Sequence, residues 1–340
     1  MSLSGVAALA GVSASTVSRV LNEQHGVAPD TAETVRVAMR EISFTPPARR
    51  RARKGTNGQG EQAKTVGFLV LGTSGEQTAP AFANLLRGVS IGARENNFDL
   101  FVSFVSNLEE LPPRISERRV GGLLLHGEQP SKAVEAQLRG LPTVWLMANR
   151  FPPRWGDQVM PDNSSIGRIA AEYLHEKGCK SAAYLSASAP SWGLQVRELA
   201  FCQHLEDAGV RVHVLRAALE SPQDFWQFDG SAARSLAERF VQMNPRPQGL
   251  FVAEDRHAPT VYSALAEAGI TLGNDGEVHL ISCNNEMPYL SRLRPAPATL
   301  DIRAESIGRR GVEQLIWRLG NTNVVERIRK LVEPALIEPI

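Results

Sequence analysis

The chain begins with two short helical patterns separated by a glycine, and this break constrains the fold of the N-terminus. Apolar residues recur at the i, i+3, i+4 spacing of a helix on both sides of it, at Val6, Leu9 and Ala10 and again at Val17, Val20 and Leu21. Gly11 can adopt the positive φ of a sharp turn, and Ser13 can accept backbone N–H bonds as the N-cap of the second helix. We therefore expect a helix-turn-helix, with the two helices packed crosswise.

The other face of the expected second helix carries small side chains and one long cation. Ala14, Ser15 and Ser18 would let the helix backbone come close to base edges in a DNA major groove. Arg19 could donate a forked pair of hydrogen bonds to one base. This composition favours DNA reading, although the apolar spacing alone would also allow a helical hairpin in some other core.

The next residues predict the end of a small domain and a basic linker. Residues 29–42 have the pattern of a third helix, and its apolar face holds Val35, Ala38 and Ile42. Five basic groups follow in the seven positions 48–54, and residues 55–62 have the composition of a flexible tether. Residues 1–64 carry nine Lys and Arg against five Asp and Glu, so this end of the chain is the part suited to phosphates.

The composition of the 340-residue chain, 43% hydrophobic and 21% charged, is typical of a globular protein of two or three domains. No apolar run reaches about 18 residues, and no export signal is evident, so we expect no membrane association and a cytoplasmic location. Three widely separated cysteines suggest neither a disulfide nor a zinc site: Cys179, Cys202 and Cys283. The motifs of common hydrolases, metalloproteases and phosphate loops are missing, so we expect no cofactor, no metal and no enzyme activity.

From residue 64 the sequence alternates between short apolar runs and helical patterns. The expected strands cover 66–71, 99–103, 122–125, 142–146, 182–185, 210–215, 249–252 and 278–281. The expected helices cover 82–95, 166–177, 196–208, 231–242 and 260–268. Such alternation indicates parallel sheets covered by helices, and about 275 residues are too many for one such layer. We expect two doubly wound subdomains with a ligand cleft between them.

Two runs at the N-terminus, Gly5 to Ser13 and Thr16 to Asn22, closely resemble the headpiece of the lactose-repressor/galactose-repressor family of transcriptional regulators. Gly5 departs from the acidic residue that is usual there. Weaker resemblances follow at Asp162-Asn163, Gly167, Ala171, Leu174, Lys177-Gly178, Ala253-Glu254-Asp255 and Ala268-Gly269-Ile270. The resemblance implies an N-terminal all-α helix-turn-helix headpiece and an α/β periplasmic-binding-protein-like core of two doubly wound parallel-sheet subdomains.

The domain boundaries expected on this basis are a headpiece at 1–47, a basic hinge or linker at 48–63 and an effector-binding and dimerisation core at 64–340. Within the core, the first subdomain would comprise about 64–161 and 287–318, and the second about 162–286 and 319–340. The implied function is that of a sequence-specific repressor, a homodimer on double-stranded operator DNA, controlled by a small molecule, most simply a carbohydrate. The expected DNA contacts are Ser13, Ala14, Ser15, Thr16, Ser18, Arg19, Asn22, Arg49, Arg50, Arg51 and Arg53.

The linker departs from the hinge helix of this family. Phe44, Pro46 and Arg51 match its pattern, whereas Arg53 stands where the family inserts a leucine into the minor groove. An arginine cannot wedge base pairs apart, but it can lie in a narrow A·T-rich minor groove. Pro47 and Arg50 also replace the usual residues. We expect the linker to add affinity more than selectivity, and a merely solvated basic linker remains the alternative.

The expected ligand site lies at the carboxyl ends of the strands, on the loops that face the cleft. Arg197 and Asp255 match family ligand contacts and suit the hydroxyls of a polyol, although an ion pair without a ligand is the alternative. Phe82 or Trp192 could cover a sugar ring. Further candidates are His126, Asn149, Trp226 and Asn284. Ser282 to Asn285 replace a Gly-Phe-Asp-Asp run of the family, so the ligand of this chain can differ from theirs.

Two other classes of function share parts of this pattern. A free sugar-binding protein of the export type would have the same cleft, but the headpiece and the missing signal disfavour it. A sugar-modifying enzyme would need a catalytic set that the sequence does not supply.

Overall fold

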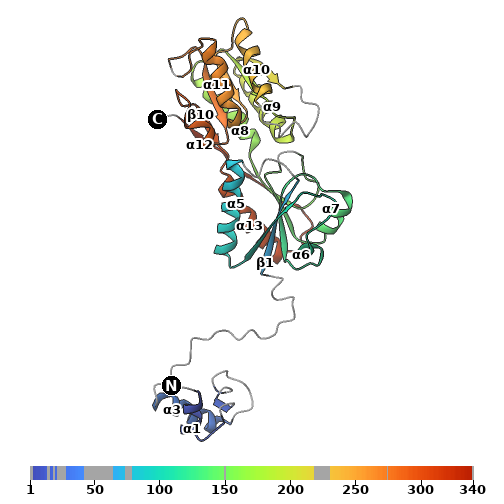
Figure 1. Cartoon of the computed structure of the whole chain (residues 1–340), viewed down its shortest axis with the longest axis vertical. Helices are drawn as coiled ribbons and strands as arrows, with labels where there is room; N and C mark the ends of the chain where they lie inside the picture. Colours follow the sequence, from blue (N-terminus) through green and yellow to red (C-terminus); the bar gives the residue numbers. More distant parts are fainter. Residues whose placement is uncertain are drawn as a thin grey trace. The chain divides into compact units, whose positions relative to one another are not determined.

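The computed structural model describes residues 3–13, 16–17, 20, 28–41, 64–72, 79–148, 151–217, 230–273 and 275–338. The chain divides into two compact units, residues 1–57 and 58–340. In Figure 1 the first unit carries α1 and α3, and the second carries all of the strands that are labelled.

The N-terminal unit has the expected turn and cap. α1 covers Leu3–Leu9, and Gly11 follows with φ of 64°. The Ser13 hydroxyl accepts a hydrogen bond from the backbone N–H of Thr16 over 3.2 Å, three residues later, which is the geometry of an N-cap. The backbone N–H of Val17 donates to the Ser13 carbonyl over 3.1 Å. The cap predicted at Ser13 is therefore confirmed.

A small apolar core joins these residues to α3 (Pro29–Glu41). It consists of Val6, Ala7, Val17, Val35 and Ala38. Leu9, expected in this core, is 49% exposed, so that prediction is wrong. α1 ends at Leu9, and the core is completed by Ala7 and by Val12 from the turn.

The larger unit contains two six-stranded sheets, and we call the lobes built on them lobe 1 and lobe 2. The sheet of lobe 1 has the order β11-β5-β4-β3-β1-β2, and all of its neighbouring strands are parallel. Its strands are β1 (Thr65–Leu71), β2 (Asp99–Val105), β3 (Gly122–Gly127), β4 (Thr143–Leu146), β5 (Asp157–Pro161) and β11 (Arg329–Val332). Its helices are α5 (Pro80–Glu95), α6 (Pro113–Ser116), α7 (Lys132–Leu138) and α13 (Ala304–Gly320). α5 and α13 lie side by side, away from α6 and α7 (Figure 1).

The sheet of lobe 2 has the order β12-β10-β9-β8-β6-β7, in which only β12 is antiparallel to its neighbour. Its strands are β6 (Ser181–Ser186), β7 (Arg211–Arg216), β8 (Gly249–Val252), β9 (His279–Cys283), β10 (Ala298–Asp301) and β12 (Ala335–Ile337). Its helices are α8 (Asn163–Glu176), α9 (Trp192–Asp207), α10 (Ser231–Gln242), the 3-10 turn η3 (Asp255–His257), α11 (Ala258–Glu267) and α12 (Met287–Leu290).

The chain crosses between the lobes three times, and two crossings differ from the expected positions. The first, from β5 into α8, lies at residue 162 as expected. The second lies at 302–303 and not near 287, because β10 pairs with β9 and so continues the sheet of lobe 2. The third lies at 333–334 and not near 319, because β11 pairs with β5 of lobe 1.

Glycines set the distance between the paired helices. A Cβ atom on Gly88 of α5 would lie 2.0 Å from the carbonyl oxygen of Glu305 in α13. A Cβ atom on Gly167 of α8 would lie 2.2 Å from the carbonyl oxygen of Arg197 in α9. The two helix pairs therefore approach closely enough to exclude any larger side chain.

Among the helices in the described ranges, not one has the length and apolar character needed to cross a membrane.

Candidate functional site

Arg197 lies at the carboxyl-end side of the lobe 2 sheet, in α9, and is buried. Its Nε donates to the Asn163 side-chain oxygen over 2.7 Å, and its Nη1 donates to the carbonyl oxygen of Ala253 over 2.9 Å. Asn163 begins α8 directly after the first crossing, and Ala253 follows β8. Arg197 thus connects the crossing to the end of β8, in the place predicted for a ligand contact.

Asp255 has no exposed surface, and it holds the loop that follows β9. Its Oδ2 accepts the backbone N–H of Glu286 over 2.7 Å, and its Oδ1 accepts the Thr299 hydroxyl over 3.0 Å. Burial raises the pKa of Asp255, although its hydrogen bonds and Arg197 oppose the rise. In this arrangement the carboxylate ties η3 to the loop after β9 and to strand β10. Its contact with a ligand hydroxyl stays a prediction.

Phe82 of α5 is buried among aromatic rings of lobe 1. It stacks on Phe68 with centroids 6.3 Å apart and lies 5.6 Å from the ring of His126. The Nδ1 of His126 is 3.0 Å from the carbonyl oxygen of Leu146. The structure therefore brings two predicted site residues, Phe82 and His126, together on the lobe 1 side.

Trp192, at the start of α9, is half-buried and touches the opposite lobe. Its ring lies 5.6 Å from the guanidinium of Arg329 in β11, and it packs on the hydrophobic cluster of lobe 1 that contains Trp145 and Phe151. A cation against an aromatic face is attractive. Trp192 thus joins the two lobes in this structure.

Asn284 follows β9 with φ of 122°. Its backbone N–H donates to the carbonyl oxygen of Leu300, and its side-chain amide donates to Glu286 over 3.4 Å. Asn149 and Trp226, also predicted for the ligand site, lie outside the described residues.

A buried polar network that the sequence did not single out lies beside these residues. Nη2 of Arg256 donates to the Ser188 hydroxyl over 2.6 Å and to Glu254 over 3.1 Å. The Ser188 hydroxyl also donates to Glu254 and lies 2.9 Å from Nε2 of His257. Burial lowers the pKa of His257. Burial opposes the ionisation of Glu254, but Arg256 and His257 outweigh it and hold its pKa well below the ordinary range.

The loops that carry this network were expected to face the cleft, but none of its four members was chosen as a ligand contact. The network comes from the ends of β6 and β8, and it puts a carboxylate, a guanidinium and a hydroxyl within one small volume. No short-range motif links residue 188 to residues 254–257. The only available signal was their position after apolar runs, which is shared by every loop at that edge.

The N-terminal unit shows part of the expected DNA-contacting face. Ser13 and Thr16 are described, and their hydroxyls lie 2.9 Å apart. The other predicted contacts lie outside the described residues: Ala14, Ser15, Ser18, Arg19, Asn22, Arg49, Arg50, Arg51 and Arg53. The structure therefore supports the scaffold of the second helix, and the reading side chains stay predictions.

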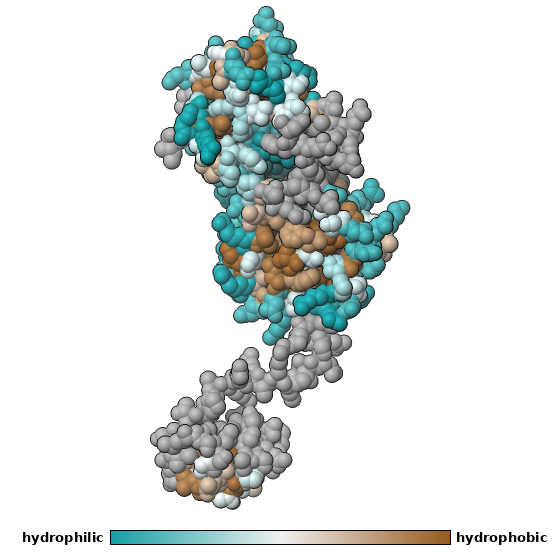
Figure 2. Space-filling view, viewed as in Figure 1, coloured by the Kyte–Doolittle hydropathy of each residue, from teal (hydrophilic) through white to brown (hydrophobic). Residues whose placement is uncertain are grey.

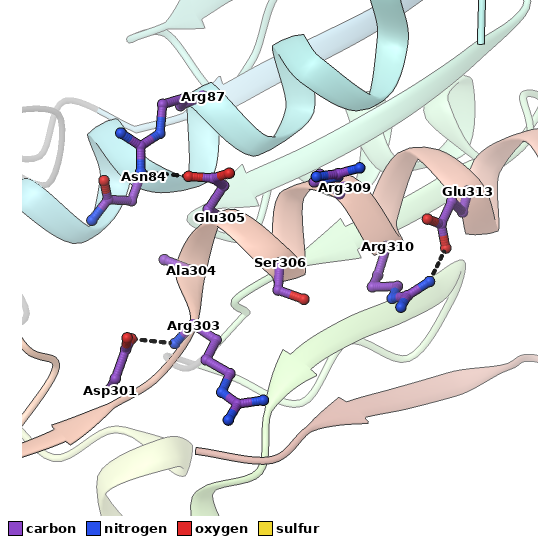
Figure 3. A pocket seen from close by; sticks show the side chains of 10 residues that line it. All are labelled: Asn84, Arg87, Asp301, Arg303, Ala304, Glu305, Ser306, Arg309, Arg310 and Glu313. Carbon is purple, nitrogen blue, oxygen red and sulfur yellow. Dashed lines mark hydrogen bonds and ion pairs between the residues drawn. The ribbon is translucent and has the colours of Figure 1, made fainter. Parts of the chain in front are cut away.

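A separate open pocket of about 620 Å³ lies where α5 meets the start of α13 (Figure 3). Its rim is charged: Arg87 pairs with Glu305, and Arg310 pairs with Glu313 at 2.8 Å. Asp301 accepts the backbone N–H of Arg303 over 2.7 Å.

In the described part of the chain, no group of three or more His, Cys, Asp or Glu side chains could hold a metal ion.

Comparison with known protein families matches both ends of the chain. Residues 2–47 match the family described as bacterial regulatory proteins, lacI family, and residues 171–338 match the periplasmic binding protein-like domain. The ribose operon repressor of Escherichia coli K12 is 28% identical over 98% of this chain and 97% of its own length.

Two solved structures share the fold over the whole chain. The transcriptional regulator CelR in complex with cellobiose has a TM-score of 0.67 at 22% identity and covers 100% of this chain and 99% of its own. The lac repressor dimer bound to operator and the anti-inducer ONPF has a TM-score of 0.65 at 21% identity, covering 100% and 98%. The expected fold class, a helix-turn-helix headpiece with a periplasmic-binding-protein-like core, is confirmed.

Proposed function

This chain belongs to the lacI family of bacterial regulatory proteins, and we propose that it represses transcription by binding a pseudo-palindromic operator as a homodimer whose affinity a small carbohydrate controls. It is a DNA-binding transcriptional regulator with a ligand-binding core, and it is not an enzyme. The observation that carries the proposal is the lacI-family match over residues 2–47, together with the Ser13 cap inside it.

The headpiece occupies residues 1–47 in this proposal, and residues 48–63 form a basic linker to the core. Arg19 reads one base edge in the major groove, because it is the single long donor among small neighbours on that helix face. The arginines of the linker, Arg49, Arg50, Arg51 and Arg53, contact phosphates or lie in the minor groove. They raise affinity for any DNA, and sequence selectivity depends on the headpiece and on the spacing of the two half-sites.

The effector in this proposal is a sugar bound where the two lobes face each other. Arg197 and the network of Ser188, Glu254 and Arg256 supply polar groups on the lobe 2 side, and Phe82 and His126 supply an aromatic surface on the lobe 1 side. Such a pairing of polar groups with rings suits the hydroxyls and the apolar face of a saccharide. The names of two similar proteins, a ribose operon repressor and a regulator complexed with cellobiose, point to the same class.

In this proposal the dimer interface includes the β2 edge of the lobe 1 sheet. β2 is one of the two edge strands of that sheet, and Phe104 in it is 49% exposed. Figure 2 shows hydrophobic residues gathered on one face of the lobe that contains α5 and α7. Apolar surface of this kind is typical of a protein interface, and a solved structure of similar fold is described as a dimer.

Selection of binding sites from random DNA by the full-length chain tests the DNA-binding part of the proposal. We expect enrichment of two related half-sites in inverted order, and sedimentation should show two chains on each site. Failure to enrich any sequence, with no DNA affinity even at low salt, would contradict the proposal and favour a free sugar-binding protein.

A thermal-shift screen of mono- and oligosaccharides tests the effector class, because a ligand that binds the folded state raises the melting temperature. The matched control is Arg197→Ala, in which the shift should be lost. A sugar that also changes operator affinity is the effector. Stabilisation that survives in Arg197→Ala would place the ligand elsewhere.

A further inference from the structure

Among the residues that the structure describes, no neighbour in the sequence caps the first turn of α5. The N-cap residue is Ala79, whose side chain has no hydrogen-bonding group, and the helix begins at Pro80. The first backbone N–H of the helix, that of Ala81, donates instead to Oε1 of Glu286 over 3.1 Å. Glu286 lies 205 residues further along the chain, in the loop between β9 and α12 of lobe 2. The acceptor for a lobe 1 helix thus comes from the other lobe.

Hydrogen bonds to residues of lobe 2 hold Glu286 in position. Its own backbone N–H donates to Oδ2 of Asp255, and Asp255 also accepts the Thr299 hydroxyl from β10. Its second oxygen accepts the side-chain amide of Asn284 over 3.4 Å. Glu286 is only 4% exposed, so water competes little for these bonds. A continuous series of hydrogen bonds therefore runs from β10 through Asp255 and Glu286 into the first turn of α5.

The bond lies beside both the expected effector site and a crossing between lobes. Phe82, next to Ala81, packs on His126, and β10 leads directly into the crossing at 302–303. A rotation of one lobe against the other about that crossing would act on this bond directly, because Ala81 belongs to lobe 1 and Glu286 to lobe 2. A carboxylate at a helix N-terminus is favourable through both the hydrogen bond and the helix dipole.

We propose that Glu286 is a positioning residue that caps α5 from the opposite lobe and thereby holds the two lobes in the arrangement of this structure. This inference goes beyond the regulatory function proposed above, and it is tested without DNA or effector. It assigns a role to a residue that contacts neither in our proposal.

The charged and titratable groups that face Glu286 come from two elements of lobe 2. Glu254 and Asp255 lie at the end of β8, and Tyr289 lies on α12, where burial together with Glu286 raises its pKa. Burial, with Asp255 and Glu254 adding to it, raises the pKa of Glu286 to about 7, although the Ala81 N–H and Asn284 oppose the rise. From α5 itself, the backbone N–H of Ala81 is the group that faces the carboxylate.

Hydrogen–deuterium exchange on the full chain tests the inference in Glu286→Ala and Glu286→Gln. In Glu286→Ala we expect exchange to rise about fivefold or more in the first turn of α5, as for the loss of a helix cap, and to rise also in residues 284–290. Glu286→Gln retains an oxygen that can accept the Ala81 N–H, so it should keep most of the protection. The matched control is Ser131→Ala, which removes the cap of α7 within lobe 1 and should affect α7 alone.

Unchanged exchange in the first turn of α5 of Glu286→Ala would overturn the inference. A uniform rise across both lobes would overturn it as well, because that result means a general loss of stability. If Glu286→Ala does not fold, the decision falls to Glu286→Gln measured at pH 6 and pH 8. The wild-type chain should then change its protection in α5 relative to Glu286→Gln between the two values, after correction for intrinsic exchange, and a constant ratio would contradict the inference.

Discussion

The Arg318 guanidinium of α13 donates to both carboxylate oxygens of Asp157 in β5, over 2.6 Å to Oδ1 and 2.9 Å to Oδ2. The side chains of Arg318 and Asp157 are only 12% and 1% exposed. Gln314 and the backbone N–H of Ile328 donate to the same carboxylate, and Arg318 also donates to the carbonyl oxygens of Val324 and Glu326. One ion pair thus ties α13, β5 and the segment before β11 together.

Arg318→Met should destabilise the core by about 3 kcal/mol or more, because it leaves the Asp157 carboxylate buried without its cation. The five tryptophans all lie beyond residue 64, so urea unfolding followed by tryptophan fluorescence reports on the core. Arg310→Met is the control, because its ion pair with Glu313 is exposed, and it should change stability by less than about 1 kcal/mol. An equal loss of unfolding free energy in both variants would show that the buried ion pair contributes no more to stability than the exposed one.

The close approach of α5 and α13 gives a second test of packing in lobe 1. Gly88→Ala would place a Cβ atom 2.0 Å from the Glu305 carbonyl oxygen, so the helices would have to move apart. We expect a loss of about 1–3 kcal/mol, although alanine is the better helix former by about 1 kcal/mol. Gly320→Ala at the end of α13 meets no atom within 4 Å and should be neutral or slightly stabilising in the same urea titration. A stabilised Gly88→Ala would disprove the close contact.

The parallel sheets could be predicted from the sequence because strands buried on both faces are continuous apolar runs. β1, for example, is buried along all but its first residue. The strands that were not predicted are short or polar, such as β5 (Asp157–Pro161) and β11 (Arg329–Val332). β11 joins the sheet by pairing with β5 across 171 residues of chain, which no local pattern reveals.

The candidate site could be predicted in part for the same reason. The rule that ligands bind at the carboxyl ends of parallel strands gave the loops after the strands as candidates, and the family resemblance singled out Arg197 and Asp255 among them. Neither could show that the Asp255 carboxylate accepts hydrogen bonds from Glu286 and Thr299, nor that Trp192 packs on Arg329. These contacts join residues far apart in the chain, and the contact of Trp192 with Arg329 also joins the two lobes, so no local sequence pattern reveals them.

Glu286 should give the stability of the core a pH dependence near neutrality. Its pKa is raised from an ordinary 4.5 to about 7, above all by burial, so the folded chain binds this proton more tightly than the unfolded chain does. Protonated Glu286 therefore stabilises the folded chain fully below about pH 4.5, and this stabilisation is lost as the pH rises to about 7. Glu286→Gln cannot ionise, so relative to wild type it should gain up to about 3 kcal/mol between pH 4.5 and pH 8.

Urea midpoints of wild type and Glu286→Gln, measured from pH 4.5 to pH 8, check this expectation. Glu313→Gln is the control, because that carboxylate is exposed and the variant should follow the wild-type profile apart from a small constant offset. Parallel profiles of wild type and Glu286→Gln would mean that Glu286 titrates in the same range in the folded and unfolded chains.

Arg19→Ala should reduce sequence discrimination while leaving affinity for random DNA almost unchanged. A bidentate contact from arginine to a base edge is worth about 1–3 kcal/mol of discrimination, which is roughly 5- to 150-fold in relative affinity. The residues around it, Ala14, Ser15 and Ser18, are too short to take over that contact. Fluorescence anisotropy with the selected operator and with a scrambled duplex, at one fixed salt concentration, measures both quantities.

Arg51→Ala in the linker separates base reading from phosphate binding. A phosphate contact carries no sequence information, so this variant should lose similar affinity for the operator and for the scrambled duplex. The slope of log affinity against log salt should also fall by about one, as expected for one fewer released counterion. If Arg19→Ala instead keeps the wild-type preference and shows this salt effect, Arg19 binds the backbone, and selectivity must come from the small residues of the helix and from half-site spacing.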